Sequence, residues 1–187
     1  MSTIIVIDIE MCLVRKEHQW EDYPYHHEII QIGAVMMNES YERTGEFSSF
    51  VRPRYGRIDH AIRELTGIRE TDTEAAPDLE TVLKEMLSWI ADSHPVFYSW
   101  SITDYKQIAR EIRAKGMNEE EMALFLDAGN WVDYQVTAGK RFHKPWRMSL
   151  EDALMLAKIE PVGKQHDGLA DAGNTARLIA KMEKEAQ

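Results

Sequence analysis

The feature that most constrains the fold is a run of β-branched residues near the N-terminus, Ile4 to Ile7, which acidic residues follow directly. A continuous apolar run of this kind is typical of a strand buried on both faces in the middle of a sheet. Asp8 and Glu10 come at its end, and the period-2 geometry of a strand points both carboxylates to the same face. We therefore predict a central strand that ends in a pair of acids.

Further apolar runs predict a sheet covered by helices. Strand patterns recur at residues 29–37, 47–51, 95–99 and 131–132. The short link between the second and third runs indicates an antiparallel hairpin, and the longer link before the second run also allows antiparallel pairing. Helical patterns follow at residues 79–90, 103–115 and 169–185, with Gly116 as a helix end and Ser149 as the N-cap of a further helix.

This order of elements predicts the fold class. Strands that come first as a meander and then alternate with helices favour an α/β fold with a five-stranded mixed sheet flanked by helices. No repeat, low-complexity run or linker-like stretch interrupts the chain. We expect residues 1–187 to form one domain.

Three groups of residues with reactive side chains occur where these elements begin or end. Asp8 and Glu10 end the first strand, Asp104 begins a helix, and His166 precedes the helix that carries Asp171 in its first turn. Each group alone has an ordinary explanation, such as a strand end that emerges into water or an acid that the helix dipole stabilises by a few tenths of a kcal/mol. Together, four carboxylates from one strand and two helix starts can meet at one edge of the sheet.

A cluster of four carboxylates favours divalent cations. Two like charges 4 Å apart repel by about 4 kcal/mol at an effective dielectric near 20. Oxygen-rich sites suit Mg²⁺ or Mn²⁺, and two ions about 3.5–4 Å apart can hold a scissile phosphate, activate a water and stabilise the leaving oxygen. His166, with an unperturbed pKa of about 6.5, suits the role of base for that water.

These motifs resemble the DEDDh 3′→5′ exonucleases of the ribonuclease H-like superfamily. The resemblance rests on residues 7–10 (Ile-Asp-Ile-Glu), residues 99–104 (Ser-Trp-Ser-Ile-Thr-Asp), and His166 with Asp171. A closer similarity is to the subgroup that contains the histone-mRNA 3′-end exonuclease and the bacterial sporulation regulator KapD. It rests on residues 28–33, 50–53, 65–68 and 166–177.

The resemblance implies the roles of the site residues. Two metal ions would be bound by four acids, namely Asp8, Glu10, Asp104 and Asp171. His166 would activate a water as general base.

It also implies a pocket for the 3′-terminal nucleotide. The base would lie between Leu65 and Trp100, with Ile68 of the same segment as a further apolar contact and Met11 near the sugar. Each of these four residues is also compatible with ordinary core packing. The large eukaryotic members carry an added nucleic-acid-binding domain for which this chain has no room, so specificity supplied by such a module is not expected.

These expectations favour an exonuclease that acts on single-stranded nucleic acid, RNA more than DNA, and releases nucleoside 5′-monophosphates. An exonuclease for single-stranded DNA or for proofreading would use the same chemistry. A regulatory binding protein on the same fold is the alternative from another class. The intact set of four acids and a histidine favours the enzyme, because a binding module does not need these residues.

The net charge of −10 is unusual for a nucleic-acid partner. A local basic patch can nevertheless steer a strand on an acidic protein. Residues 140–147 combine cations with aromatic rings, a composition typical of single-strand tracks and also of solvated loops. A second candidate track consists of Arg52, Arg54 and Arg57.

Other features constrain the environment of the chain. Cys12 is the only cysteine, which excludes an internal disulfide and a multi-cysteine metal site. His18, His26 and His27 lack the spacing of common zinc sites. The chain has no run of 18 apolar residues and its first residues lack the pattern of a signal peptide, so we expect a cytoplasmic location and no membrane partner.

Overall fold

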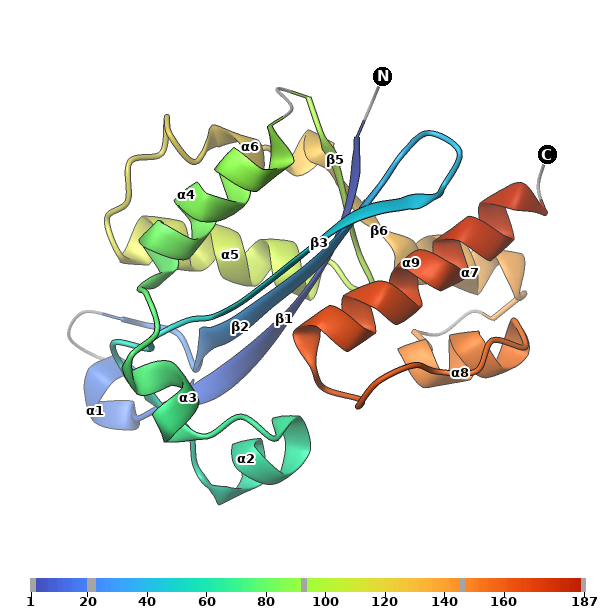
Figure 1. Cartoon of the computed structure of the whole chain (residues 1–187). Helices are drawn as coiled ribbons and strands as arrows, with labels where there is room; N and C mark the ends of the chain where they lie inside the picture. The colour runs from blue at the N-terminus through green and yellow to red at the C-terminus, as the bar shows by residue number, and fades with distance from the viewer. Residues whose placement is uncertain (1–2, 20–22, 92–93, 145–146, 186–187) are drawn as a thin grey trace.

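The computed structural model describes residues 3–19, 23–91, 94–144 and 147–185, shown in Figure 1. Within them, six strands form one mixed sheet in the order β3-β2-β1-β5-β6, with β4 paired to the far end of β1. The pairs β1–β2, β2–β3 and β1–β4 are antiparallel, whereas β5 is parallel to both β1 and β6. The bounds are β1 Ile4–Val14, β2 His27–Met37, β3 Arg43–Phe50, β4 Gly56–Arg57, β5 Val96–Ser99 and β6 Trp131–Asp133.

The five predicted strands are all present, and both predicted antiparallel pairings are confirmed. The predicted number of five strands was one too low. The central strand does not end near Glu10 but continues to Val14 after a register shift between Glu10 and Met11, and this extension gives β4 an edge to pair with. A two-residue strand has no periodicity, so the sequence carries no signal for β4.

Helices cover both faces of the sheet. The longer ones are α4 Leu79–Ile90, α5 Thr103–Ala114, α7 Tyr134–Arg141 and α9 Gly168–Lys184. The short ones are α1 Lys16–Gln19, α2 His60–Thr66, α3 Glu70–Glu74, α6 Ala123–Leu126 and α8 Leu150–Leu156, with a 3₁₀ turn at Ala128–Asn130. None of the described helices is long and apolar enough to cross a membrane.

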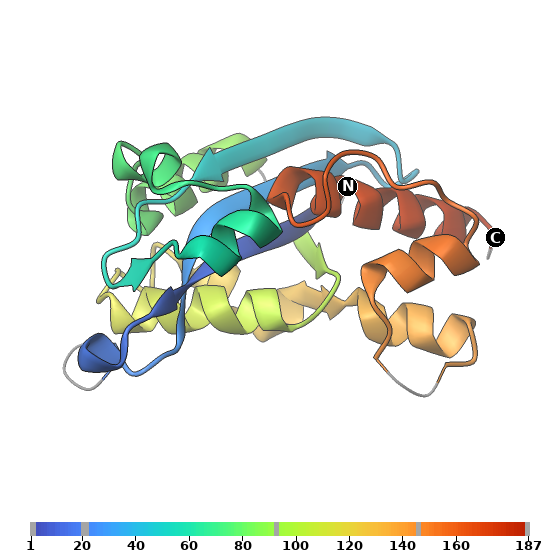
Figure 2. The ribbon, with the colours of Figure 1, turned by 90° about the horizontal axis from the view of Figure 1, so that it is seen from below.

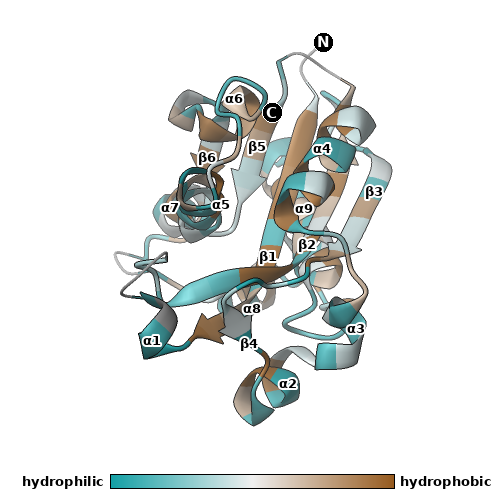
Figure 3. Cartoon of the chain, turned by 90° about the vertical axis from the view of Figure 1, so that its left-hand side faces the viewer, coloured by the Kyte–Doolittle hydropathy of each residue, from teal (hydrophilic) through white to brown (hydrophobic). Residues whose placement is uncertain are grey.

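The alternation of β1 divides the core into two layers. Ile5, Ile7 and Ile9 pack with α4, α5 and α6 on one face. Ile4 and Val6 point to the other face, where they pack with α7, α8 and α9. Figures 1 and 2 show the sheet between these two groups of helices, and Figure 3 shows hydrophobic residues gathered on β1 and β2. Asp8 and Glu10 continue the second set, so they point toward the face that α9 covers.

The helix ends agree with the signals in the sequence. Ser149 caps α8 by accepting a hydrogen bond from the backbone N–H of Asp152 at 3.0 Å. Gly116, at φ +68°, follows the end of α5. The helices α1, α2, α3 and α7 were not predicted; α1, α2 and α3 are short, and α7 extends into the basic segment that we considered as a single-strand track or a solvated loop.

Candidate active site

The sheet topology brings three of the four acidic residues to one place. Ile7 of β1 pairs with Ser99 at the end of the parallel strand β5, so the start of α5 lies beside the acidic residues of β1. Asp104 therefore approaches Asp8, and after burial its negative charge is the next cause that raises the pKa of Asp8. Glu10 and Asp104 are both buried, at 8% exposure.

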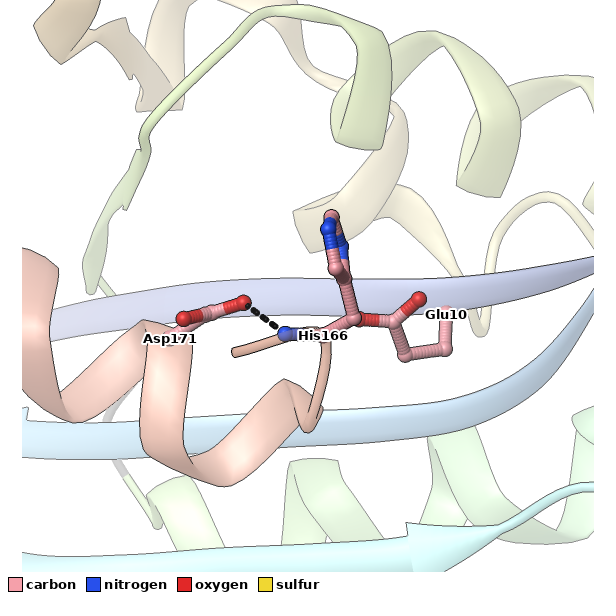
Figure 4. Close-up of side chains that lie close together, drawn as sticks. All are labelled: Glu10, His166 and Asp171. Carbon is pink, nitrogen blue, oxygen red and sulfur yellow. Dashed lines mark hydrogen bonds between the residues drawn. The ribbon is translucent and has the colours of Figure 1, made fainter. Parts of the chain in front are cut away.

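The fourth acid and the histidine come from the start of α9. The backbone N–H of His166 donates to the carboxylate of Asp171 at 2.8 Å, and His166 itself takes a positive φ of 62°. Possible ligand atoms of Glu10, His166 and Asp171 all lie within 4.8 Å of one another, and Figure 4 shows His166 between the two acids. A positive φ costs a non-glycine residue about 1–3 kcal/mol, so the surrounding contacts hold this loop in place.

Two glycines allow α9 to approach this closely. Gly33 of β2 pairs with Asp8, and Gly168 is the first residue of α9. A Cβ atom on Gly33 would overlap with the carbonyl carbon of Gly168 and the nitrogen of Leu169. Backbone therefore lies directly on backbone, which places the first turn of α9 beside the acids of β1.

A buried amide fixes the start of α9 against β2. Gln31, which is 3% exposed and pairs with Glu10, accepts a hydrogen bond from the N–H of Gly168 at 3.0 Å. Its amide nitrogen also lies 3.5 Å from the carboxylate of Asp167, the N-cap of α9. Gln31 and Asp167 were not among the predicted site residues, although both lie in the motif segments at 28–33 and 166–177.

Burial and mutual repulsion favour the protonated form of all four carboxyls. Burial, with Asp171 and Asp104 nearby, raises the pKa of Glu10 to about 8. Burial also raises the pKa of Asp104 to about 7, although three backbone hydrogen bonds act in the opposite direction. The pKa values of Asp8 and Asp171 are raised for the same first reason. Oxygen donors in this electrostatic state fit divalent cations, because the cations would replace the bound protons.

The stability of the metal-free protein should fall as pH rises. Between the unfolded pKa of Glu10, about 4.5, and its folded pKa of about 8, the native state binds more protons than the unfolded state. In EDTA, the free energy of unfolding is thus expected to decrease by a few kcal/mol between pH 5 and pH 8. Urea denaturation at several pH values measures this slope.

Bound Mn²⁺ should remove most of this dependence of the free energy of unfolding on pH. In EDTA, Glu10→Gln should reduce the dependence, because glutamine has no proton to lose at this position. A free energy of unfolding that stays constant or rises between pH 5 and pH 8 without metal would contradict the electrostatic description of the site.

A cavity of about 570 Å³ opens beside the carboxylates. His166 and three of the predicted acids line it, namely Asp8, Glu10 and Asp171. The predicted substrate contacts Met11, Leu65 and Trp100 line it as well. Asp104 is not among the lining residues. The start of α8 forms part of the wall through Ser149, Leu150 and Glu151, for which the sequence offered only a helix-capping signal.

The predicted substrate contacts differ in their surroundings. Leu65 of α2 is 47% exposed, whereas Trp100 is 9% exposed and also belongs to the core under α7, α8 and α9. Ile68 does not line the cavity; it is 4% exposed and packs in a separate core cluster with Cys12. Ile62, one turn before Leu65 on α2, lines the cavity instead.

No described residue of the predicted basic tracks lines this cavity. Lys140 and Arg141 end α7, and Arg141 lines a separate cavity with Lys158 and Lys181. Pro145 and Trp146 of the same patch lie outside the described residues.

The arginines of the second track are also elsewhere. Arg52 and Arg57 line a third cavity, which Glu70 shares, and Arg54 lies over the ring of Tyr55.

The three histidines near residues 18–27 do not form a metal site among the described residues. His27 lines the cavity beside the acids, and the side chain of His18 lies outside the description. The one group of possible metal ligands found in the described part of the chain consists of Glu10, His166 and Asp171.

Known proteins share sequence similarity with most of this chain. A model of a family described as Exonuclease (RNase_T) matches residues 5–179. The human ERI1 exoribonuclease 2 is 28% identical over 204 residues, which cover 96% of this chain and 28% of the relative. The 3′-5′ exonuclease Snipper of Drosophila melanogaster is 24% identical, and the match covers 97% of this chain and 69% of the relative. This chain thus spans little more than a quarter of the length of ERI1 exoribonuclease 2.

Solved structures show the same ribonuclease H-like fold. The nuclease domain of 3′hExo, a DEDDh family member bound to rAMP, superposes with a TM-score of 0.81 at 20% identity and covers 98% of this chain and 92% of that domain. Exonuclease I of E. coli in complex with a dT13 oligonucleotide has a TM-score of 0.70 at 16% identity, covering 98% of this chain and 41% of that one.

Proposed function

Because the chain belongs to the exonuclease family whose model matches residues 5–179, we propose that it is a metal-dependent 3′→5′ exonuclease for single-stranded nucleic acid. The observation that carries the proposal is the convergence of four carboxylates and His166 around the middle of β1, beside a cavity of about 570 Å³. RNA is proposed as the preferred strand, since the relatives by sequence include exoribonucleases and a solved structure with the same fold binds rAMP. We further propose that residues 1–187 act as one cytoplasmic domain.

In this proposal the acids hold the metal and the histidine moves a proton. Asp8, Glu10, Asp104 and Asp171 would bind two divalent cations, Mg²⁺ or Mn²⁺, because both ions prefer oxygen ligands. When bound, such ions neutralise phosphate charge and lower the pKa of water. His166 accepts a proton from the attacking water, and the water oxygen forms a bond to phosphorus as the phosphorus–O3′ bond breaks. The leaving O3′ takes up a proton from solvent, which gives a 3′-hydroxyl on the shortened strand and a free nucleoside 5′-monophosphate.

The direct test uses a 5′-labelled single-stranded RNA and its DNA equivalent, incubated with Mn²⁺, Mg²⁺ or EDTA. A ladder that shortens from the 3′ end and is absent in EDTA is the expected result, and the ratio of the two rates identifies the preferred strand. If neither strand is cleaved with either metal, the protein is not this enzyme, and a regulatory binding protein on the same fold becomes the better description.

His166→Asn should lower kcat by about 10²–10⁴-fold, the usual contribution of a general base. Asparagine tolerates the positive φ at this position, and the hydrogen bond to Asp171 comes from the backbone, so the loop should keep its shape. Calorimetry should therefore show Mn²⁺ affinity within a few-fold of the original protein.

His143→Asn is the matched control, because His143 also has a positive φ (52°) and is exposed. Loss of Mn²⁺ binding together with activity in His166→Asn would instead make His166 a metal ligand.

Leu65→Ala should weaken the binding of a nucleoside 5′-monophosphate about fivefold to tenfold, since a base would lose an apolar contact on one face. Leu65 is exposed on α2, so its truncation should leave the fold intact, whereas Trp100→Ala would also remove a core side chain. Titration calorimetry in Mn²⁺ measures the change. Leu156→Ala, at a similar exposure of 41% and outside the catalytic cavity, is the control; an equal effect in both variants would remove Leu65 from the pocket.

A further inference from the structure

Lys164 lies in the loop that carries His166, beside the catalytic cavity. Its neighbours Gly163 and Gln165 both line the cavity. Its ammonium reaches across to α2, where Nζ lies 2.6 Å from the position that a Cβ atom on Gly67 would take. Gly67 ends α2, two residues after Leu65, so Lys164 spans the gap between the two walls of the cavity.

Lys164 is exposed, and its charge is not used in an ion pair within the described part of the chain. Among the residues that the structure describes, no carboxylate lies within the 4.0 Å ion-pair distance of this lysine. Its ammonium is therefore free to take an anionic ligand.

A nucleic-acid strand brings such a ligand. The scissile phosphate would lie against the carboxylates. Each further phosphate of the strand would be repelled by a protein whose net charge is −10. Arg141, Arg52 and Arg57 of the predicted basic tracks line other cavities, and no described residue of either track lines the catalytic cavity. Lys164, between the His166 loop and α2, would lie close to a strand whose terminal base contacted Leu65.

We propose that Lys164 binds a backbone phosphate of the strand next to the scissile phosphate, and so couples strand binding to the loop that carries the general base. The inference rests on the proposed exonuclease function and adds a strand-binding residue to it. It predicts that Lys164 matters for substrates with several phosphates and not for a substrate with one.

The experiment compares Lys164→Gln on two substrates in Mn²⁺. One is a single-stranded oligonucleotide, and the other is an aryl ester of a nucleoside 5′-monophosphate, which contains the scissile phosphate alone. We expect KM for the oligonucleotide to rise about fivefold to tenfold with kcat nearly unchanged, and kcat/KM for the ester to stay within twofold. The slope of log(kcat/KM) against log salt for the oligonucleotide should become shallower by about 0.7, the value for one phosphate contact on a single strand.

Two variants serve as controls. Lys164→Arg keeps the positive charge and should retain the oligonucleotide KM within about twofold. Lys140→Gln makes the same charge change at the exposed end of α7, outside the catalytic cavity, and should have little effect. Equal losses on both substrates, or equal effects of Lys164→Gln and Lys140→Gln, would overturn the proposal.

Failure of the exonuclease function itself can be told apart from failure of this inference. If the original protein cleaves neither substrate, fluorescence anisotropy of a labelled single strand in EDTA still compares the dissociation constants of the original protein and Lys164→Gln. A fivefold or greater weakening, relieved in Lys164→Arg, supports the phosphate contact; an unchanged dissociation constant rejects it.

Discussion

Asp104→Asn should abolish turnover, by about 10³-fold or more, and leave the protein folded. Asp104 supplies a negatively charged oxygen to the proposed metal site, and a neutral amide cannot replace that charge. The same change should not lower stability in EDTA, because burial raises the pKa of this carboxyl to about 7 and its charged form is unfavourable without metal. The measurements are kcat in Mn²⁺ on a labelled single strand, and urea denaturation in EDTA.

A matched control is available in another helix. Asp152 lies in the first turn of α8, as Asp104 does in α5, but Asp152 is exposed whereas Asp104 is buried. Asp152→Asn should keep nearly full activity. If Asp104→Asn retains more than about a tenth of the original kcat, or if its loss of activity follows unfolding, the assignment of Asp104 to the metal site is wrong. Asp8→Asn should behave as Asp104→Asn does, since Asp8 belongs to the same cluster.

Gly33→Ala should destabilise the protein by about 3 kcal/mol or more and remove activity even where the protein remains folded. A methyl group at this position would overlap with backbone atoms of Gly168 and Leu169, which cannot rotate away as a side chain can. The start of α9 would have to move off the sheet, and His166 and Asp171 would move with it. In an ordinary strand, replacement of glycine by alanine stabilises a protein by about 0.5–1 kcal/mol. A loss of stability in Gly33→Ala would therefore indicate the close contact between Gly33 and α9.

Gly45→Ala provides the comparison within the same sheet. Gly45 lies on β3, and a Cβ atom there would lie 3.4 Å from the ring of Trp89, which is ordinary contact. This variant should be about as stable as the original protein. Urea denaturation and Mn²⁺ calorimetry on both variants separate the two effects. A Gly33→Ala protein with normal stability and normal metal affinity would show that α9 does not need its close approach to β2.

The elements of the fold were predictable where one segment alone carries the signal. The β-branched run at Ile4–Ile7 requires burial on both faces, and the spacing of apolar residues over 79–90 requires one buried helix face. Ser149 and Gly116 indicated helix ends through local hydrogen bonding and backbone preference. Period-2 alternation likewise placed Asp8 and Glu10 on one face of a strand, and their family motif suggested partners in Asp104, His166 and Asp171.

The tertiary structure decided which of these elements meet. Ile68 and Leu65 belong to one four-residue motif, yet one is buried in a core cluster and the other lines the cavity. The hydrogen bond from Gly168 to Gln31 joins residues 137 positions apart, and the contact of Lys164 with Gly67 joins two separate loops. Local periodicity reports which face of an element is buried but not the element that buries it. The shape of the cavity therefore depends on non-local backbone contacts, above all the approach of α9 to Gly33, which only the folded chain contains.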